Sequence, residues 1–211
     1  MTPVLWGRKS SVNVQKVMWA LAECDIPHER IDAGFTYGHT DTEAFAAMNP
    51  MRQVPVWQED GLTLWESHVI LRHLARGPAA ALWPETRADQ ALADLWMEFT
   101  TTTLLPPMIG VFFQTVRHRP EDRSKDLLAK HLGDLDVAMD VLEARLSGRN
   151  WLVGDRVTLA EMTAGTAMFR FHHMDIPRKE RPGVQAWYER MCARPAYQAT
   201  AMASYEELRQ G

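Results

Sequence analysis

Cysteine is scarce in this chain of 211 residues. The two cysteines, Cys24 and Cys192, lie far apart, and neither belongs to a C-x-x-C pair. A disulfide framework is therefore not expected, and reduced, inert thiols fit a cytoplasmic protein. Eight histidines are present, but none lies in an H-E-x-x-H motif or in a Cys/His cluster with zinc spacing. The sequence thus predicts no metal site.

Long apolar runs and an excess of charge of one sign are also missing. No run approaches the roughly 20 apolar residues of a membrane span, and residues 1–11 lack the apolar core of a signal peptide. The formal net charge is −4, which argues against a general nucleic-acid or anionic-membrane surface. Neither G-x-G-x-x-G nor a P-loop occurs. We therefore expect no membrane and no nucleic acid as partner.

The first 77 residues have the pattern of a small mixed α/β domain. Apolar stretches predict four strands, at 3–6, 28–32, 54–57 and 62–65. Helical periodicity and capping residues predict three helices, at 12–24, about 42–48 and 66–77. The order β-α-β-α-β-β-α allows a parallel crossover unit, followed by an antiparallel hairpin at Asp60-Gly61.

The composition then changes, and no convincing strand follows. We predict domains at 1–77 and 88–211, joined by a linker at 78–87 that is rich in breakers. The second domain should be all-α. Its predicted helices lie at 87–113, 121–146, 158–172, 184–193 and 195–208. The first should be disturbed at Thr100–Thr103 and kinked or split at Pro106-Pro107, and Thr158 with Glu161 forms a capping box.

Three short polar segments are candidates for chemistry. Ser10, Ser11 and Asn13 open the first helix, where they could serve as caps or receive an anion such as a thiolate. No G-x-S-x-G elbow surrounds Ser11, so a hydrogen-bond donor is a simpler role for it than a nucleophile.

The other two segments follow later in the first domain. Val54-Pro55 is either a plain edge-strand proline or a cis turn that offers the Val54 backbone to an extended peptide. Glu66-Ser67 lies where a strand becomes a helix, so Ser67 is either an N-cap alone or part of a carboxylate site. In an open α/β layout such segments can converge on one crevice.

Together these segments resemble a known family. The stretches SSVNVQKVMWALAE, NPMRQVPVW, LWESHVILRHLAR and GDRVTLAEMTAG are similar to those of the cytosolic glutathione transferases, especially their serine-type, theta-like bacterial branch. The resemblance implies a thioredoxin-like N-terminal domain and an all-α C-terminal domain. It also implies a homodimer, glutathione as co-substrate, and attack of its thiolate on a hydrophobic electrophile.

The resemblance assigns residues to glutathione. Ser11 matches the serine that hydrogen-bonds the sulfur, with Asn13 as a rival. The remaining glutathione contacts would be Ser10, His39, Gln53, Val54, Pro55, Glu66 and Ser67. Val54 would act as the backbone clamp, Glu66 and Ser67 would hold the γ-glutamyl group, and His39 would reach the glycyl carboxylate. Arg52 departs from the family pattern, and either adds a cation near the tripeptide or faces water.

The electrophile pocket should be apolar and lie between the domains. Its candidate residues are Trp6, Phe35, Met97, Thr101, Thr102, Leu105, Met108 and Phe112. Core packing is the alternative for each, and the threonines either present hydroxyls to a substrate or tolerate the nearby kink. Two other functions stay open: a non-catalytic glutathione transferase-like binding protein, and a glutathione-dependent dehalogenase, isomerase or peroxidase.

Overall fold

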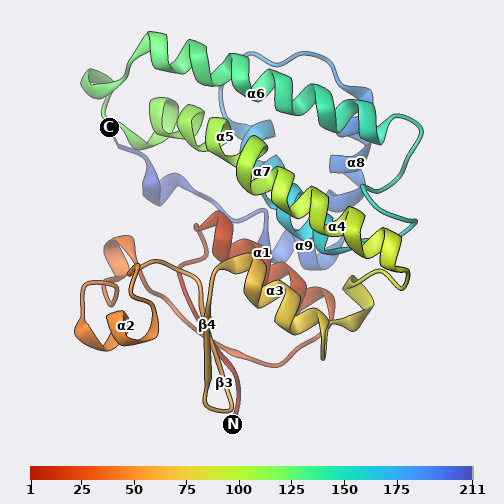
Figure 1. The fold of residues 1–211 in the computed structure, drawn as a ribbon. Helices are drawn as coiled ribbons and strands as arrows, with labels where there is room; N and C mark the ends of the chain where they lie inside the picture. The colour runs from red at the N-terminus through yellow and green to blue at the C-terminus, as the bar shows by residue number, and fades with distance from the viewer. Residues whose placement is uncertain (211) are drawn as a thin grey trace. The chain divides into compact units, whose positions relative to one another are not determined.

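The computed structural model describes residues 1–210, which form two compact units (Figure 1). The N-terminal unit comprises Met1–Trp83 and Pro195–Ala203, and the helical unit comprises Pro84–Arg194 and the residues from Ser204 onward. The change between units after Trp83 falls inside the expected linker. Residues 195–203, however, pack with the N-terminal unit, whereas the sequence assigned them to the all-α domain.

A four-stranded sheet forms the centre of the N-terminal unit. Its strands are β1 (Val4–Trp6), β2 (Glu29–Ile31), β3 (Val56–Glu59) and β4 (Leu62–Trp65), in the order β2-β1-β3-β4. β1 and β2 are parallel, whereas β3 is antiparallel to both β1 and β4. The predicted crossover and hairpin are therefore confirmed. β3 begins at Val56 and not at Val54, because the ladder starts only after Pro55.

The two faces of this sheet follow the alternation of its side chains. Trp6 and Val56 are paired across β1 and β3, and with Phe45 of α2 (Glu43–Met48) they build one apolar cluster. Leu5 and Trp57 point to the opposite face and are fully buried. That face is covered by α1 (Val12–Glu23) and α3 (Ser67–Ala75), which pack against each other (Figure 1).

The N-terminal unit is completed by α9 (Pro195–Thr200). This helix packs on α1, and the rings of Trp19 and Tyr197 meet edge to face with centroids 4.7 Å apart. The prediction of one helix from 195 to 208 is wrong. The chain leaves the helix after Thr200 because Tyr205 packs against Phe112 of the helical unit, with ring centroids 5.4 Å apart, and only a short turn forms at Glu206–Leu208.

Helices dominate the other unit, as predicted. They are α4 (Arg87–Phe99), α5 (Leu105–Phe112), α6 (Lys125–Leu146), α7 (Leu159–His173) and α8 (Pro182–Cys192). The predicted start of α6 at Glu121 is wrong, because Ser124 caps the helix by accepting a hydrogen bond from the Leu127 N–H.

A π-helical segment, Thr100–Leu104, separates α4 from α5 where the sequence predicted a disturbance. Pro106 and Pro107 supply no N–H for the carbonyls of the preceding turn. The Thr100 and Thr102 hydroxyls donate back to the carbonyls of Trp96 and Glu98, at 2.8 and 2.9 Å. The threonine run therefore accommodates the widened turn.

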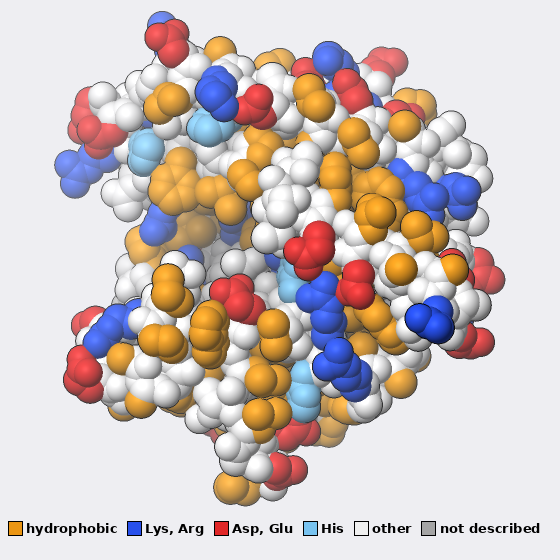
Figure 2. Space-filling view, viewed as in Figure 1, with side chains coloured by type: hydrophobic (Ala, Val, Ile, Leu, Met, Phe, Trp, Pro, Cys, Tyr) orange, Lys and Arg blue, Asp and Glu red, His pale blue; other side chains and the backbone are white. Residues whose placement is uncertain are grey.

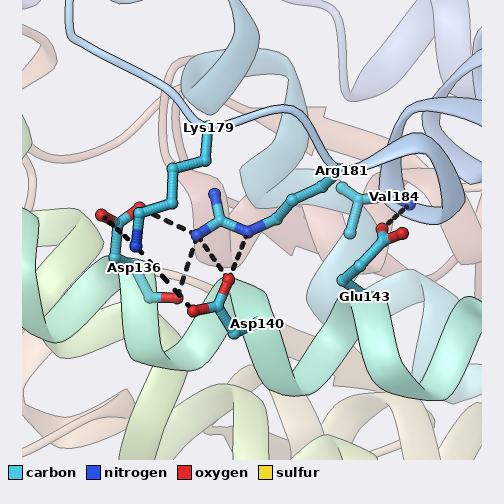
Figure 3. A network of polar contacts seen from close by, with 6 residues as sticks. All are labelled: Asp136, Asp140, Glu143, Lys179, Arg181 and Val184. Atoms are coloured by element: carbon cyan, nitrogen blue, oxygen red, sulfur yellow. Dashed lines mark hydrogen bonds and ion pairs between the residues drawn. The ribbon is translucent and has the colours of Figure 1, made fainter.

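An ionic network ties α6 to the segment that leads into α8 (Figure 3). The Arg181 side chain is 4% exposed and contacts carboxylate oxygens of Asp136 and Asp140 at 2.9 and 2.8 Å. Lys179 joins Asp136 at 3.1 Å, and Glu143 accepts hydrogen bonds from the backbone N–H groups of Gly183 and Val184. These contacts satisfy the start of α8 without any ligand.

The capping box of α7 is confirmed. The Glu161 carboxylate accepts hydrogen bonds from the Thr158 N–H, the Thr158 hydroxyl and the Leu152 N–H, at 2.9, 2.8 and 2.6 Å. Glu161 is fully buried, and burial raises its pKa to about 7. α7 is thus held at its start by a buried acid that titrates near neutrality.

Among residues 1–210, no helix combines the length and apolar character that crossing a bilayer requires. No group of three or more histidine, cysteine or acidic side chains of the described residues is arranged to hold a metal ion. On the face shown in Figure 2, basic and acidic side chains are interspersed.

Glu161 predicts a pH dependence of folding stability. Its folded pKa, about 7, lies above the ordinary glutamate value of 4.5, so the folded state binds the proton more tightly. The stabilisation from this proton is complete below about pH 4.5 and is lost as the pH rises to about 7. Relative to Glu161→Gln, we expect the wild type to lose up to about 3 kcal/mol of unfolding free energy over that interval.

Urea unfolding of both proteins at several pH values checks this expectation. Glu189→Gln, on an exposed position of α8, is the matched control and should follow the wild type. A wild-type curve that runs parallel to that of Glu161→Gln between pH 5 and pH 7 would contradict the account.

Candidate functional site

The strand register brings the three polar segments to one end of the sheet. Trp6, the last residue of β1, is paired with Val56, the first residue of β3, and Val56 is paired with Trp65, the last residue of β4. The residues that follow β1, precede β3 and follow β4 therefore leave the sheet side by side. They are 7–11, 54–55 and 66–67. The predicted convergence of these segments is what the register produces.

Gly7 makes the close approach possible. Its φ is +150°, and a Cβ atom at this position would lie 2.4 Å from Cγ2 of Val14 and 3.2 Å from Cβ of Val54. Any side chain there would therefore collide with α1 and crowd the loop before β3. The absence of one lets Val54 lie against the beginning of α1.

Ser11 is the N-cap residue of α1, but its hydroxyl makes no capping hydrogen bond. Its backbone is fixed on both sides: the N–H donates to the Arg8 carbonyl at 3.2 Å, and the carbonyl accepts from the Gln15 N–H at 2.9 Å. The half-buried side chain thus sits beside the unpaired N–H groups of the helix start. This arrangement suits a donor to an anion better than a cap.

The two neighbours of Ser11 differ in accessibility. Asn13, in the first turn of α1, is exposed, whereas Ser10 is only 2% exposed. Asn13 therefore remains an alternative to Ser11 as the contact for an anion, whereas the Ser10 side chain is almost fully buried.

Val54 and Pro55 are joined by a cis peptide bond, which settles the choice between a cis turn and a plain edge-strand proline. Within residues 1–210, no hydrogen bond occupies the backbone N–H or C=O of Val54. Such groups can pair with an extended peptide. The preceding loop is held by Asn49, whose Nδ2 donates to the carbonyl of Gln53 at 2.8 Å, and the Gln53 side chain is exposed.

Glu66 and Ser67 begin α3 in a way that the sequence did not reveal. The predicted N-cap, Ser67, is wrong: Glu66 holds that position, with φ of +70° and ψ of 114°, and Ser67 is the first helical residue. A non-glycine residue rarely adopts such angles. They leave the Glu66 side chain exposed while Ser67 is 4% exposed at the helix start.

Several aromatic rings lie near the end of β1. Trp6 contacts the His39 ring with centroids 5.6 Å apart, and its Nε1 donates to the Gln58 side chain at 2.9 Å. Phe35 is 36% exposed, and the Arg8 guanidinium carbon lies 5.9 Å from its ring centroid. Trp6 and His39 are thus in contact, and Phe35 lies near Arg8, whose carbonyl accepts from the Ser11 N–H.

Arg52 neither stands free as a cation nor simply faces water. Its Nη2 donates to the Glu43 carboxylate at 2.6 Å, and its Nη1 donates to the carbonyls of Thr42 and Thr40 at 3.0 and 3.4 Å. It therefore links the loop before α2 to the loop before β3.

Sequence reasoning missed Lys16 and His68. Lys16 on α1 is 1% exposed, and its Nζ lies 3.1 Å from Nε2 of His68 on α3. Burial lowers the pKa of Lys16 to about 7, against the opposing charge of Glu66. Burial, together with the charges of Lys16 and Arg72, lowers the pKa of His68 to about 3. The only signal in the sequence was a lysine next to the apolar positions of an amphipathic helix.

The predicted electrophile residues of the helical unit fall into two groups. Met97, Leu105, Met108 and Phe112 are each at most 7% exposed, and Phe112 packs under the Arg170 guanidinium at 4.6 Å. Thr101 and Thr102 are exposed, and each hydroxyl donates to the carbonyl four residues before it. The unit also has cavities of about 440 and 600 Å³, and none of the six residues lines either.

The two cysteines belong to different units of the chain. Cys24 and Cys192 are free thiols, and burial raises the pKa of each. The protonated, less reactive form is therefore favoured at both positions, in line with the predicted inert role.

Family models match both parts of the chain. The glutathione S-transferase N-terminal domain matches residues 1–76, and the C-terminal domain of the same family matches residues 86–195. Glutathione S-transferase GstB of Escherichia coli is 32% identical over 94% of this chain and 97% of its own length. Glutathione S-transferase F13 of Arabidopsis thaliana is 30% identical over 93% and 94% of the two chains.

A solved structure agrees with these matches. The theta-class glutathione S-transferase of Xanthomonas axonopodis pv. citri, determined with glutathione bound, superposes with a TM-score of 0.93. It is 35% identical, over 96% of this chain and 98% of that one. The chain therefore belongs to the glutathione S-transferase family, and glutathione is its co-substrate.

Proposed function

We propose that this transferase activates glutathione as a thiolate through Ser11 and the N-terminus of α1. The observation that carries the proposal is the Ser11 hydroxyl, which stands at the N-cap position without a capping bond. Asn13, two residues after Ser11 in the first turn and exposed, is the second donor. In this role Ser11 donates to the sulfur and never forms a covalent bond to the substrate.

The energy needed is modest. A free thiol has a pKa of about 8.5, so little thiolate exists at neutral pH. A hydrogen bond to the charged form and the helix N-terminus together contribute about 1–3 kcal/mol. Together they can lower the pKa of the bound thiol by one to two units. The thiolate then forms a bond to carbon of the electrophile, whose leaving group departs with the electron pair.

The remaining segments would hold the tripeptide. The open backbone of Val54 can pair with the cysteinyl part, as one strand pairs with another. The Glu66 carboxylate can accept from the γ-glutamyl ammonium, while the N–H and hydroxyl of Ser67 can bind the γ-glutamyl carboxylate. Gln53 and His39 are both exposed and suit the glycyl end.

The electrophile and the assembly are further parts of the proposal. Trp6 and Phe35 offer apolar surface beside Ser11, which favours a hydrophobic electrophile. We infer a homodimer from family membership. Conjugation is the reaction we favour, and dehalogenation, isomerisation and peroxide reduction are alternatives that begin from the same thiolate. A purely binding role is disfavoured by the available Ser11 hydroxyl.

Ser11→Ala should lower kcat/KM for a nitro-activated aryl chloride by about 10- to 100-fold, since it removes one hydrogen bond to a charged sulfur. Asn13→Ala should cost less than about threefold, a few tenths of a kcal/mol. Steady-state kinetics at saturating glutathione measures both. Ser147→Ala, an exposed serine at the end of α6, is the matched control and should be unchanged. Full activity in Ser11→Ala with a large loss in Asn13→Ala would move the donor role to Asn13.

Glu66→Gln should weaken binding of S-methylglutathione by about tenfold or more, because it removes a charged acceptor. An analogue without the γ-glutamyl amino group should bind the variant and the wild type equally. Calorimetric titration gives both affinities. Glu29→Gln is the matched control, since Glu29 is paired with Val4 at the other end of the sheet. An equal loss for the analogue would show that Glu66 does not contact the ammonium.

A further inference from the structure

Lys16 is a buried lysine that the thiolate chemistry does not use. It lies on α1, little more than one turn after Ser11, and 1% of its surface is exposed. Lysine is almost never fully buried unless its charge has a partner. The hydrogen bond of its Nζ to Nε2 of His68, at 3.1 Å, identifies one partner.

The direction of this hydrogen bond follows from the two pKa values. The pKa of His68 is lowered to about 3, so the ring is neutral near pH 7 and its Nε2 can accept a hydrogen bond. As an ammonium, Lys16 is the donor in this bond; as an amine, it can donate to Nε2 or accept from an Nε2–H tautomer of the neutral ring. His68 therefore holds the Lys16 side chain in place in both protonation states.

The bond connects the two halves of the proposed glutathione site. α1 carries Ser11 at its start, and α3 begins with Glu66 as N-cap and Ser67 as first residue. His68 directly follows that pair. Glu66 is also the opposite charge that acts on the Lys16 ammonium.

We propose that Lys16 is a positioning residue for the γ-glutamyl subsite: anchored by His68, its ammonium orients the Glu66 carboxylate for the ammonium of glutathione. This inference rests on the proposed function, because it takes Glu66 as the γ-glutamyl contact. Glu66 has little else to fix its orientation, because its side chain is exposed and its backbone has φ of +70°. An exposed carboxylate has several rotamers, and a fixed neighbouring cation favours those that point toward it.

The charges that act on Lys16 and His68 come from few residues. Glu66, at the start of α3, acts on Lys16, and Arg72 of α3 acts on His68. The other helix packed on α1 is α9, whose titratable side chain, Tyr197, contacts Trp19 instead. Lys16, with a pKa of about 7, is ammonium below neutrality and amine above it. The orienting charge is therefore lost as the pH rises, and binding of glutathione should weaken with it.

Binding of S-methylglutathione to the full chain at pH 6 and pH 8 tests this, because that ligand has no ionisable thiol. Between these values we expect the wild-type Kd to rise about three- to tenfold more than that of Lys16→Met. Lys16→Met should already bind about three- to tenfold more weakly at pH 6. Titration of the ligand's own ammonium is common to both proteins and cancels in the comparison.

Two further variants sharpen the test. Lys9→Met removes an exposed lysine from the loop before α1 and should retain the wild-type pH dependence. Glu66→Gln removes the group on which Lys16 acts and should lose the extra rise in Kd. Thermal unfolding reports whether Lys16→Met is folded. If it is not, the change in Kd between pH 6 and pH 8 is compared between the wild type and Glu66→Gln.

The outcomes separate this inference from the function on which it rests. A wild-type protein that binds S-methylglutathione with the same pH dependence as Lys16→Met or Glu66→Gln overturns the positioning role and leaves the glutathione site intact. A wild-type protein that does not bind S-methylglutathione at either pH overturns both.

Discussion

The pairing of Trp6 with Val56, and of Val56 with Trp65, is the constraint on which the site depends. Because β3 runs antiparallel to both neighbours, its first residue lies at the level where β1 and β4 end. The loops to α1 and α3 therefore start beside the loop that enters β3. A slip of β3 by one residue would turn Val56 away from Trp6 and Phe45 and would shift the loop before β3 relative to the ends of β1 and β4.

The starts of α1 and α3 depart from the usual preference for capped helix ends with relaxed backbone angles. Ser11 stands at the start of α1 without capping it, and Glu66 begins α3 with a positive φ. By contrast, Thr158 and Glu161 close the start of α7 completely, and Glu143 closes that of α8. The open starts of α1 and α3 lie at the proposed glutathione site, whereas α2, α7 and α8 have closed starts. The hydrogen-bonding groups of these two open starts are thus available where a ligand is proposed to bind.

Local patterns in the sequence predicted much of this architecture, and long-range contacts account for the failures. The positions of the four strands along the chain, the Thr158 capping box and the break near Pro106 follow from neighbouring residues. The Lys16–His68 bond joins residues 52 positions apart, and no periodicity reveals it. The end of α9 at Thr200 depends on the packing of Tyr205 against Phe112. Within the site, Ser11 and Val54 could be identified from motifs, but the backbone of Glu66 could not.

The central claim is that Ser11 and the start of α1 stabilise a thiolate. Ultraviolet absorbance of the thiolate, followed by pH titration of glutathione bound to the wild-type protein, tests this claim most directly. The account predicts a bound thiol with a pKa about one to two units below the value of about 8.5 for a free thiol. A bound thiol that titrates like free glutathione would contradict it.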